Sequence, residues 1–180
     1  MTPILYFLRS SEQYIVNNML QFAYRVDESS KTVDEIKELK IYTQHYGFTT
    51  KDLGLYALDK HTIAGGIWIR LLNKDSGANG FVDEDTPILS IGVKPEFRAK
   101  GIGSAMMEQL LLEAGVLYKQ ISVSVIEDSV SFFEKFGFKK VSDSTEISPI
   151  DAKLTVTMVK KLEDILVRPT DGYDPNKWMD

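Results

Sequence analysis

The stretch from Pro87 to Ala114 constrains the fold of this 180-residue chain more than any other. It opens with an apolar run, Ile88 to Val93, of the length and composition of a buried β-strand. A turn broken by Pro95 follows. Apolar residues at helical spacing then predict a helix: Ile102, Met106, Leu110 and Ala114. The chain therefore brings the start of a helix to the end of a buried strand.

The turn between this strand and helix carries two glycines, Gly101 and Gly103, and three basic residues. The basic residues are Lys94, Arg98 and Lys100. The first N–H groups of a helix have no intrahelical acceptor, and the helix dipole adds partial positive charge at the same end. Glycine has no Cβ and lets the backbone approach a ligand closely. The turn is therefore predicted to bind a phosphate or diphosphate, the alternative being that its glycines only turn the chain.

Two common phosphate-binding motifs do not match this turn. A P-loop requires Lys followed by Ser or Thr after its last glycine, whereas Lys100 precedes both glycines. A dinucleotide-binding G-x-G-x-x-G motif requires a third glycine where Met106 stands. Both nucleotide-binding folds are thereby disfavoured.

Composition limits the class of protein. Charged residues make up 26% of the chain and hydrophobic residues 43%, which is typical of a globular protein. The net charge of -5 provides no general attraction to nucleic acid or an anionic membrane, so we expect neither as a partner. No apolar stretch reaches the roughly 18 residues of a membrane span, and the N-terminus has no basic signal region, so a cytoplasmic location is expected.

The chain contains no cysteine, which removes disulfides, a thiol nucleophile and cysteine metal sites. Two separated histidines, His45 and His61, disfavour a zinc site, so no metal is expected. Residues 1–162 are predicted to form one domain. Prolines and glycine interrupt every periodicity in residues 163–180, which are predicted to be a C-terminal extension whose Trp178 docks on the domain or on a partner.

Periodicity predicts alternating groups of strands and helices. Strands are expected at residues 4–8, 53–58, 63–72, 88–93, 121–126, 138–141 and 153–159. Helices are expected at residues 10–26, 33–47, 101–114 and 129–136, the last with Asp128 as its N-cap and Gly137 after its end. Gly65 and Gly66 within a strand suggest a bulge or a close backbone approach. Residues 73–85 are predicted to be a loop.

Two motifs carry a family resemblance. Arg98-x-x-Gly101-x-Gly103 resembles the R/Q-x-x-G-x-G/A signature of the GNAT superfamily of acyl-CoA-dependent N-acetyltransferases. About 25 residues later, the segment from Glu127 to Phe138 resembles the second GNAT signature, N-x-x-A-x-x-x-Y-E-K-x-G-F. The similarity covers roughly Leu53 to Val159, with both signatures on the expected elements.

The resemblance implies an α+β fold. The expected architecture is a mixed, mainly antiparallel central sheet with helices on both faces, in the order β-α-α-β-β-β-α-β-α-β-β. It also implies that the strands at 88–93 and 121–126 splay apart. The pantetheine arm of acetyl-CoA would then lie in the gap, beside the backbone of Ile91 and Val93.

The resemblance further implies acetyl-CoA as co-substrate and direct acetyl transfer to an amine of a small molecule or peptide. The diphosphate would be bound by the backbone of the glycine turn, namely Arg98, Ala99, Lys100, Gly101, Ile102, Gly103 and Ser104. Asp128 and Phe133, in the second signature, are expected to line the cofactor site. A backbone N–H of Gly92 or Val93 would stabilise the oxyanion.

Three positions depart from the family pattern. Phe133 stands where the family most often has a tyrosine as general acid, and Ile88 stands where relatives often have a glutamate as general base. A thiol pKa of about 8.5 allows coenzyme A to leave as thiolate, but an alkyl ammonium with a pKa of about 10 must first lose a proton. Asp128 replaces an asparagine, and its carboxylate would repel a phosphate that came close.

Substitute bases are few. Glu84 and Asp85, with Asp83, form an acidic run that could act through a water chain, although such a run is usually a solvated loop. Tyr46 and His45 are further candidates, from the second predicted helix.

These departures leave other functions open. An acyl-CoA-binding module without catalytic activity is the first alternative, and a plain α/β interaction domain is the second. A homodimer is possible for the enzyme and for the binding module alike.

Overall fold

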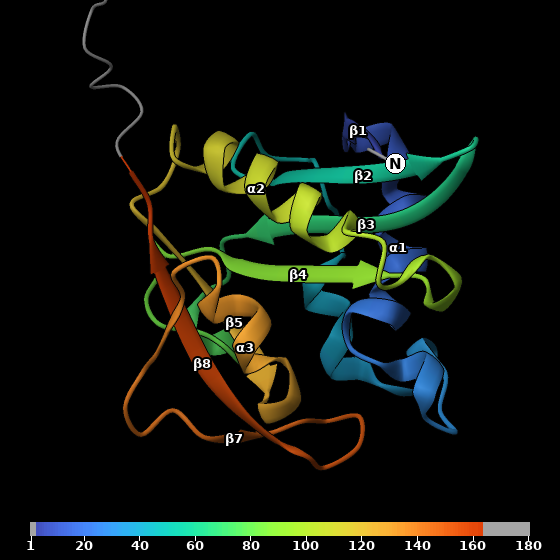
Figure 1. The fold of residues 1–180 in the computed structure, drawn as a ribbon. Coiled ribbons are helices and arrows are strands. Elements are labelled where there is room, and N and C mark those ends of the chain that lie inside the picture. The colour runs from blue at the N-terminus through green and yellow to red at the C-terminus, as the bar shows by residue number, and fades with distance from the viewer. Residues whose placement is uncertain (1–2, 164–180) are drawn as a thin grey trace, which may run out of the picture.

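One eight-stranded sheet runs through residues 3–163, the part of the chain that this computed structural model describes (Figure 1). The strands are β1 (Ile4–Phe7), β2 (Leu53–Asp59), β3 (Thr62–Arg70), β4 (Ile88–Val93), β5 (Gln120–Ile126), β6 (Lys139–Lys140), β7 (Glu146–Ile147) and β8 (Leu154–Lys161). Their order is β1-β2-β3-β4-β5-β8-β6, with β7 also paired to β8. Every pairing is antiparallel except β4 with β5. The predicted mainly antiparallel α+β sheet is confirmed.

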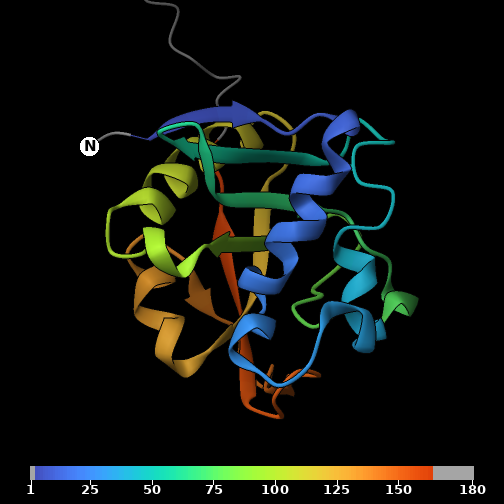
Figure 2. The same cartoon turned by 90° about the vertical axis from the view of Figure 1, so that its right-hand side faces the viewer.

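Helices cover both faces of this sheet, as predicted (Figure 2). The α-helices are α1 (Gln13–Ala23), α2 (Ile102–Ala114) and α3 (Val130–Glu134). Short 3-10 helices are η1 (Ser10–Glu12), η2 (Val26–Glu28), η3 (Val33–Glu35), η4 (Lys37–Tyr42), η5 (Lys74–Ser76), η6 (Pro95–Phe97) and η7 (Glu127–Ser129). Each face has its own core because strand residues alternate between faces. Ile67 and Ile69 pack with α2 and α3, whereas Trp68 packs with α1.

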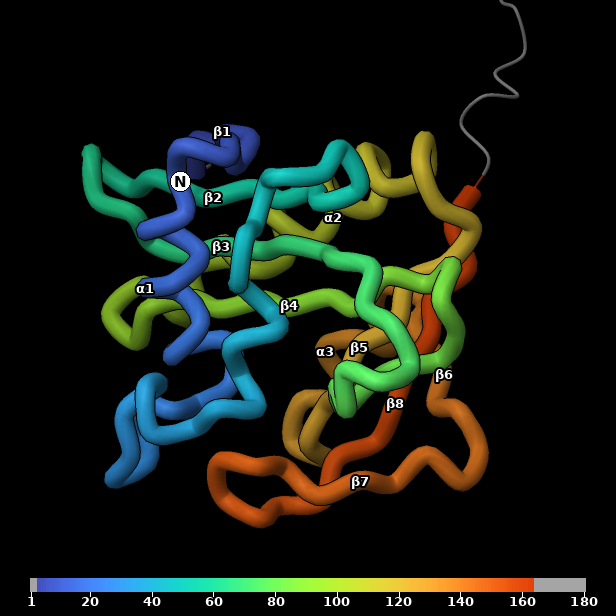
Figure 3. Tube along the Cα trace, turned by 180° about the vertical axis from the view of Figure 1, so that it is seen from behind, coloured from blue at the N-terminus to red at the C-terminus, as the bar shows by residue number. Residues whose placement is uncertain are grey.

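The second predicted helix, residues 33–47, is wrong as an α-helix. The chain forms the two 3-10 segments η3 and η4 there, which cross the α1 face of the sheet (Figure 3). Ile36, Leu39 and Tyr42 are buried and recur every three residues. That spacing suits the three residues per turn of a 3-10 helix better than the 3.6 of an α-helix.

Helix α1 lies directly on β4 because Gly92 has no side chain. A Cβ at Gly92 would lie 2.7 Å from the backbone N of Ala23, and one at Gly66 would lie 3.0 Å from Cγ of Met19. The register between β2 and β3 also shifts beside Ala57, opposite the Gly65 segment. A Cβ at Gly65 would also lie 2.7 Å from the carbonyl O of Gly92. Of the two alternatives predicted at Gly65–Gly66, a bulge or a close backbone approach, the structure thus has an irregular register and a close approach. The C-terminal end of α1 is held over the middle of the sheet.

Several boundaries differ from the predictions. Asp128 is not the N-cap of α3: it lies within η7, and α3 begins after Ser129, without a side-chain cap. Gly137 has the positive φ, +89°, expected of a residue that ends a helix. Strand β7 was not predicted, because it has only two residues. The predicted C-terminal extension, with Trp178, lies outside the described residues apart from Glu163.

None of the helices within residues 3–163 combines the length and apolar character that crossing a membrane requires.

Candidate active site

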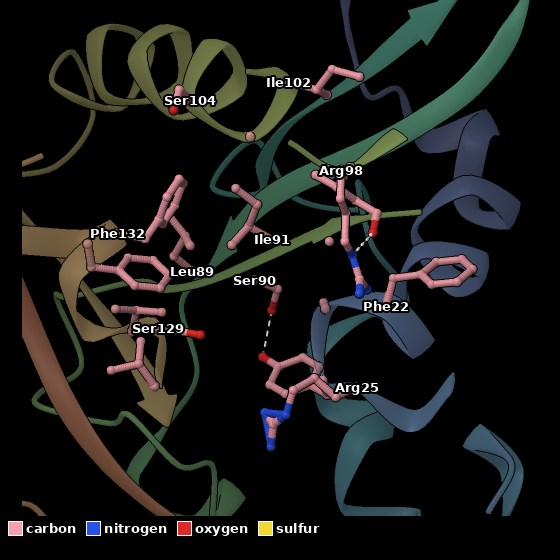
Figure 4. Close-up of a pocket in the computed structure, with 18 of the residues that line it drawn as sticks. Phe22, Arg25, Leu89, Ser90, Ile91, Arg98, Ile102, Ser104, Ser129 and Phe132 are labelled. Atoms are coloured by element: carbon pink, nitrogen blue, oxygen red, sulfur yellow. Dashed lines mark hydrogen bonds between the residues drawn. The ribbon is translucent and has the colours of Figure 1, made fainter. Parts of the chain in front are cut away.

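A cavity of about 670 Å³ opens between β4 and β5 (Figure 4). One wall is β4 from Leu89 to Val93, and the opposite wall combines β5 with α3. The end of α1 and the glycine turn before α2 contribute the remaining sides. The predicted site residues that line it are Ile91, Gly92, Val93, Arg98, Ala99, Gly101, Ile102, Gly103, Ser104 and Phe133.

The cavity exists because β4 and β5 part after a single parallel pair. Ile88 pairs with Ser122, and the Ser122 N–H donates to the carbonyl of Pro87 at 3.0 Å. The predicted splay of these strands is thus present. It leaves the side of β4 that faces β5 without a neighbouring strand beyond Ile88.

The alternating ladder decides which β4 backbone groups face this gap. The Lys94 N–H donates to the carbonyl of Ala64 at 2.9 Å, so Lys94 and every second residue before it bond to β3. Gly92 therefore directs its backbone groups to β3, and Ile91 and Val93 direct theirs to the gap. Of the two amides predicted as oxyanion donors, that of Val93 has the suitable direction and that of Gly92 does not.

The glycine turn forms a concave set of backbone N–H groups at one end of the cavity. Ala99 has φ +60° and Gly101 has φ +81°, and the right-handed helix α2 begins directly after Gly101. A change of handedness between neighbouring residues is the backbone pattern of a nest, a concavity suited to anions. Gly101 is the N-cap of α2 and provides no side chain to bond its first amides. A positive φ at a non-glycine residue such as Ala99 costs conformational free energy. Strained backbone of this kind is common at functional sites.

Arg98 joins the turn to neighbouring elements across the cavity. Its Nε donates to the carbonyl of Val93 at 3.1 Å, and its guanidinium lies 3.3 Å from Glu28 and 3.8 Å from Asp27. Part of its charge is thus balanced by the carboxylates of η2. The hydrogen bond from the Arg98 Nε also shows that the Val93 carbonyl points into the gap and not toward β3.

Aromatic rings form the α3 wall. Phe133 is 5% exposed and packs edge-on against Phe132 and Phe138, with ring centroids 5.2 Å and 5.5 Å away. Phe132 points into the cavity (Figure 4). The wall is apolar and supplies no hydroxyl group where the family signature most often has a tyrosine.

Two hydroxyl groups meet on the other side of the cavity. Tyr24, at the end of α1, lies 2.7 Å from the Ser90 hydroxyl on β4 (Figure 4). The Tyr24 ring stacks on Tyr42 with centroids 4.7 Å apart. Burial, with the neighbouring Tyr42, raises the pKa of Tyr24 well above its ordinary value, although the Ser90 hydrogen bond acts in the opposite direction.

Arg25 lines the cavity and lies at its lower end in Figure 4. Its guanidinium donates to Asp151 at 2.9 Å, which links the end of α1 to the loop between β7 and β8. Burial alone would raise the pKa of Asp151. The hydrogen bond from the Lys153 N–H and the charge of Arg25 outweigh it and hold that pKa below its ordinary value.

Several predicted site residues lie elsewhere. Lys100 is not part of the cavity lining and holds its ammonium 5.4 Å from the Phe97 ring centroid. Asp128 is exposed and does not line the cavity either. Glu84 and Asp85 are exposed outside the cavity. Asp83 accepts hydrogen bonds from the Asp85 N–H and the Thr86 hydroxyl, at 2.9 and 2.8 Å, so it stabilises its own turn.

The other two base candidates are also remote from the cavity. Tyr46 is buried on the α1 face beside Arg70 and Asp52, and burial raises its pKa well above the ordinary value. His45 lines a separate groove of about 580 Å³ and stacks on Phe48.

Sequence reasoning missed the contribution of α1 and its end. The missed residues that line the cavity include Phe22, Tyr24, Arg25, Glu28, Ser90, Ser124, Ser129, Phe132 and Lys135. In the sequence, the one signal that could have marked Tyr24 and Arg25 is that they follow the last apolar residues of a predicted helix. Their place over the cavity depends on how α1 packs on Gly92.

Comparison with known structures supports the fold. An acetyltransferase of the GNAT family from Streptococcus pneumoniae superposes with a TM-score of 0.64 at 15% identity, covering 90% of this chain and 100% of that one. An acyl-CoA N-acyltransferase from Pseudomonas aeruginosa gives 0.64 at 12% identity, covering 88% and 99%. A GNAT phosphinothricin acetyltransferase from Sinorhizobium meliloti, solved in complex with acetyl-CoA, gives 0.61 at 18% identity, covering 98% and 97%.

The sequence supplies a second, independent comparison. Residues 52–140 match the family model described as an acetyltransferase (GNAT) domain. This range contains both signature segments, the gap between β4 and β5, and the glycine turn. Residues 52–140, which hold the glycine turn and the gap between β4 and β5, therefore form a domain of the GNAT acetyltransferase family, and the fold of the described chain is that of GNAT structures.

Proposed function

We propose that this protein transfers the acetyl group of acetyl-CoA directly to an amine of a small molecule or peptide. The observation that carries the proposal is the gap between β4 and β5, which leads at one end into the nest of the glycine turn. An extended chain fits such a gap by adding to the strand edge, and a diphosphate fits the nest.

The residues present fit coenzyme A. A Cβ at Gly101 would have no neighbour within 4 Å, so open space lies beside the N-cap of α2, and a Cβ at Gly103 would only reach ordinary contact with Phe132 at 3.6 Å. The backbone N–H groups from Ala99 to Ser104 would bind the diphosphate. The backbone of Ile91 and Val93 would bond to the pantetheine amides. Bound acetyl-CoA supplies an acetyl group that is activated as a thioester.

The chain's own contribution to acetyl transfer is position and polarity. The Val93 amide faces the gap and would stabilise negative charge on the carbonyl oxygen. The apolar wall of Phe132 and Phe133 would exclude water from the thioester. Direct attack by the amine requires no covalent enzyme intermediate, in agreement with a chain that contains no cysteine.

Isothermal titration calorimetry with acetyl-CoA, followed by assays of free thiol release over a panel of amines, tests this proposal. We expect saturable binding, and turnover with at least one amine. Gly103→Glu should weaken binding at least 100-fold, because a carboxylate would occupy the mouth of the nest and repel the diphosphate. Asn73→Glu, which adds a carboxylate in an exposed loop outside the cavity lining, is the control and should bind as the wild type does.

A second candidate, an acyl-CoA-binding module without catalysis, is favoured by two observations. Phe133 provides no proton donor, and the carboxylate of Glu28 at the cavity is paired with Arg98. Binding of acetyl-CoA with no turnover over the whole panel would support the module. Absence of binding by well-folded protein would rule out both functions.

A further inference from the structure

Acetyl transfer from a thioester to an amine has a proton to move, and the cavity offers few groups to move it. Among the described lining residues, Glu28 alone carries a carboxylate; its side chain is 52% exposed and pairs with Arg98. The guanidinium groups of Arg98 and Arg25 are each paired with a carboxylate. The Lys135 ammonium lies 5.4 Å from the Phe132 ring centroid. Hydroxyl groups are what remains.

Two of these hydroxyl groups are already joined by a hydrogen bond. Tyr24 and Ser90 lie 2.7 Å apart on the same side of the cavity and come from two packed elements, the end of α1 and β4. Either hydroxyl can be the donor, so a proton can pass between them in either direction. Ser90 is next to Ile91, the residue whose backbone faces the gap, so the pair lies beside the predicted path of the thioester.

The pair is also held in place. Ser90 is 3% exposed on the central strand β4, and the Tyr24 ring stacks on the buried ring of Tyr42. Tyr42 is itself anchored, because its hydroxyl donates to the carbonyl of Asn79 at 3.3 Å. Preorganised groups of this kind are what proton transfer in an active site requires.

We propose that the Tyr24–Ser90 pair is the proton relay of this enzyme, moving one proton from the attacking amine nitrogen to the departing sulfur. The inference rests on the proposed function. As the C–N bond forms, one hydroxyl accepts the nitrogen proton and passes its own proton across the hydrogen bond. The other hydroxyl donates its proton to the sulfur, which keeps the electron pair of the broken C–S bond. Both hydroxyls end neutral.

The electrostatics of Tyr24 suit this role. Because burial raises its pKa, Tyr24 stays protonated at the pH of any ordinary assay and is a donor, not a phenolate base. A relay that returns both hydroxyls to neutrality never leaves a buried phenolate. It also supplies the acid that the Phe133 position lacks, and it accepts the one proton that a neutral amine releases on attack. An alkyl ammonium loses its first proton to solvent before this step.

Kinetics of Tyr24→Phe provide the first test, because this change removes one oxygen and retains the stacked ring. We expect kcat to fall about 100-fold while the KM for acetyl-CoA changes less than about two-fold. Ser90→Ala should cause a similar loss, and the double variant should lose little more, since the two residues act as one unit. Tyr56→Phe, on β2 and outside the cavity lining, is the control and should keep the wild-type kcat.

A binding measurement without turnover provides the second test. A Tyr24 hydroxyl near the sulfur should make the wild type bind coenzyme A about five-fold more tightly than desulfo-coenzyme A. Tyr24→Phe should bind the two equally. Equal binding by the wild type, or a kcat for Tyr24→Phe within about three-fold of the wild type, would overturn the relay and leave the proposed function intact. Failure of the wild type to bind either compound would instead refute the proposed function.

Discussion

At the scale of single residues, a glycine positions the site as much as any polar group does. Gly92 lets the backbone of α1 rest on β4, with Ala23, one residue before Tyr24, at the contact. This contact brings the end of α1 over the cavity. The distance from Tyr24 to Ser90 is therefore a consequence of the small size of Gly92.

Gly92→Ala should lower the free energy of unfolding by about 1–3 kcal/mol, because the added Cβ would lie 2.7 Å from the backbone N of Ala23 and α1 would have to move. Urea denaturation monitored by circular dichroism measures this change. Gly103→Ala is the control: its Cβ would have ordinary contacts, and an alanine within α2 should leave stability unchanged or slightly higher. Equal stability of Gly92→Ala and the wild type would contradict the packing argument.

At the scale of elements, charged links connect segments that the sheet does not join. Arg25 and Asp151 join the end of α1 to the loop between β7 and β8, and Arg98 joins the glycine turn to η2. Exposed ion pairs contribute little to overall stability. The effect of these two ion pairs is local, because each holds two elements that border the cavity close together.

The Arg25–Asp151 link should make stability depend on pH in acid. Because the pKa of Asp151 is lower in the folded chain than its ordinary value of 3.8, the stabilisation by Asp151 is fully present above about pH 4 and is lost as the pH falls through the folded pKa. Asp151→Asn should therefore lower Tm at pH 7, and the difference from the wild type should shrink below pH 4. Thermal scans from pH 7 to pH 2.5 measure it.

The exposed Asp75→Asn serves as the control and should follow the wild type throughout this pH range. A difference between Asp151→Asn and the wild type that stayed constant into acid would show that the link is not electrostatic.

At the scale of the whole molecule, the cavity lies where the two cores meet. The α1 core and the core beneath α2 and α3 share β4, and the gap beside this strand is bounded by α1 on one side and α3 on the other. A ligand in the gap would contact both halves at once. Binding should thus stabilise the domain as a unit.

Unfolding should accordingly respond to acetyl-CoA. At a ligand concentration of 100 times Kd, the free energy of unfolding should rise by about 2.7 kcal/mol by mass action. Chemical denaturation with and without acetyl-CoA measures the shift, and Gly103→Glu should abolish it. A calorimetric Kd without any such shift would indicate that the ligand also binds the unfolded chain.

Local sequence determines much of this protein. The strand at Ile88–Val93, the glycine turn and the helix after it could be predicted because hydrophobic period, turn chemistry and helix-end electrostatics are properties of neighbouring residues. Prediction failed where the patterns of α- and 3-10 helices overlap. The spacing of Ile36, Leu39 and Tyr42 predicted an α-helix, but this segment forms 3-10 helices.

Only the tertiary structure decided which side chains share the cavity. Tyr24 and Ser90 are 66 residues apart in the chain, and their hydrogen bond exists because α1 crosses β4 at a glycine. The acidic run at Asp83–Asp85 precedes β4 directly in sequence, yet its local hydrogen bonds hold it outside the cavity. Neighbours along the chain determine the elements, but long-range packing determines which of their side chains meet, and no period in the sequence encodes that packing.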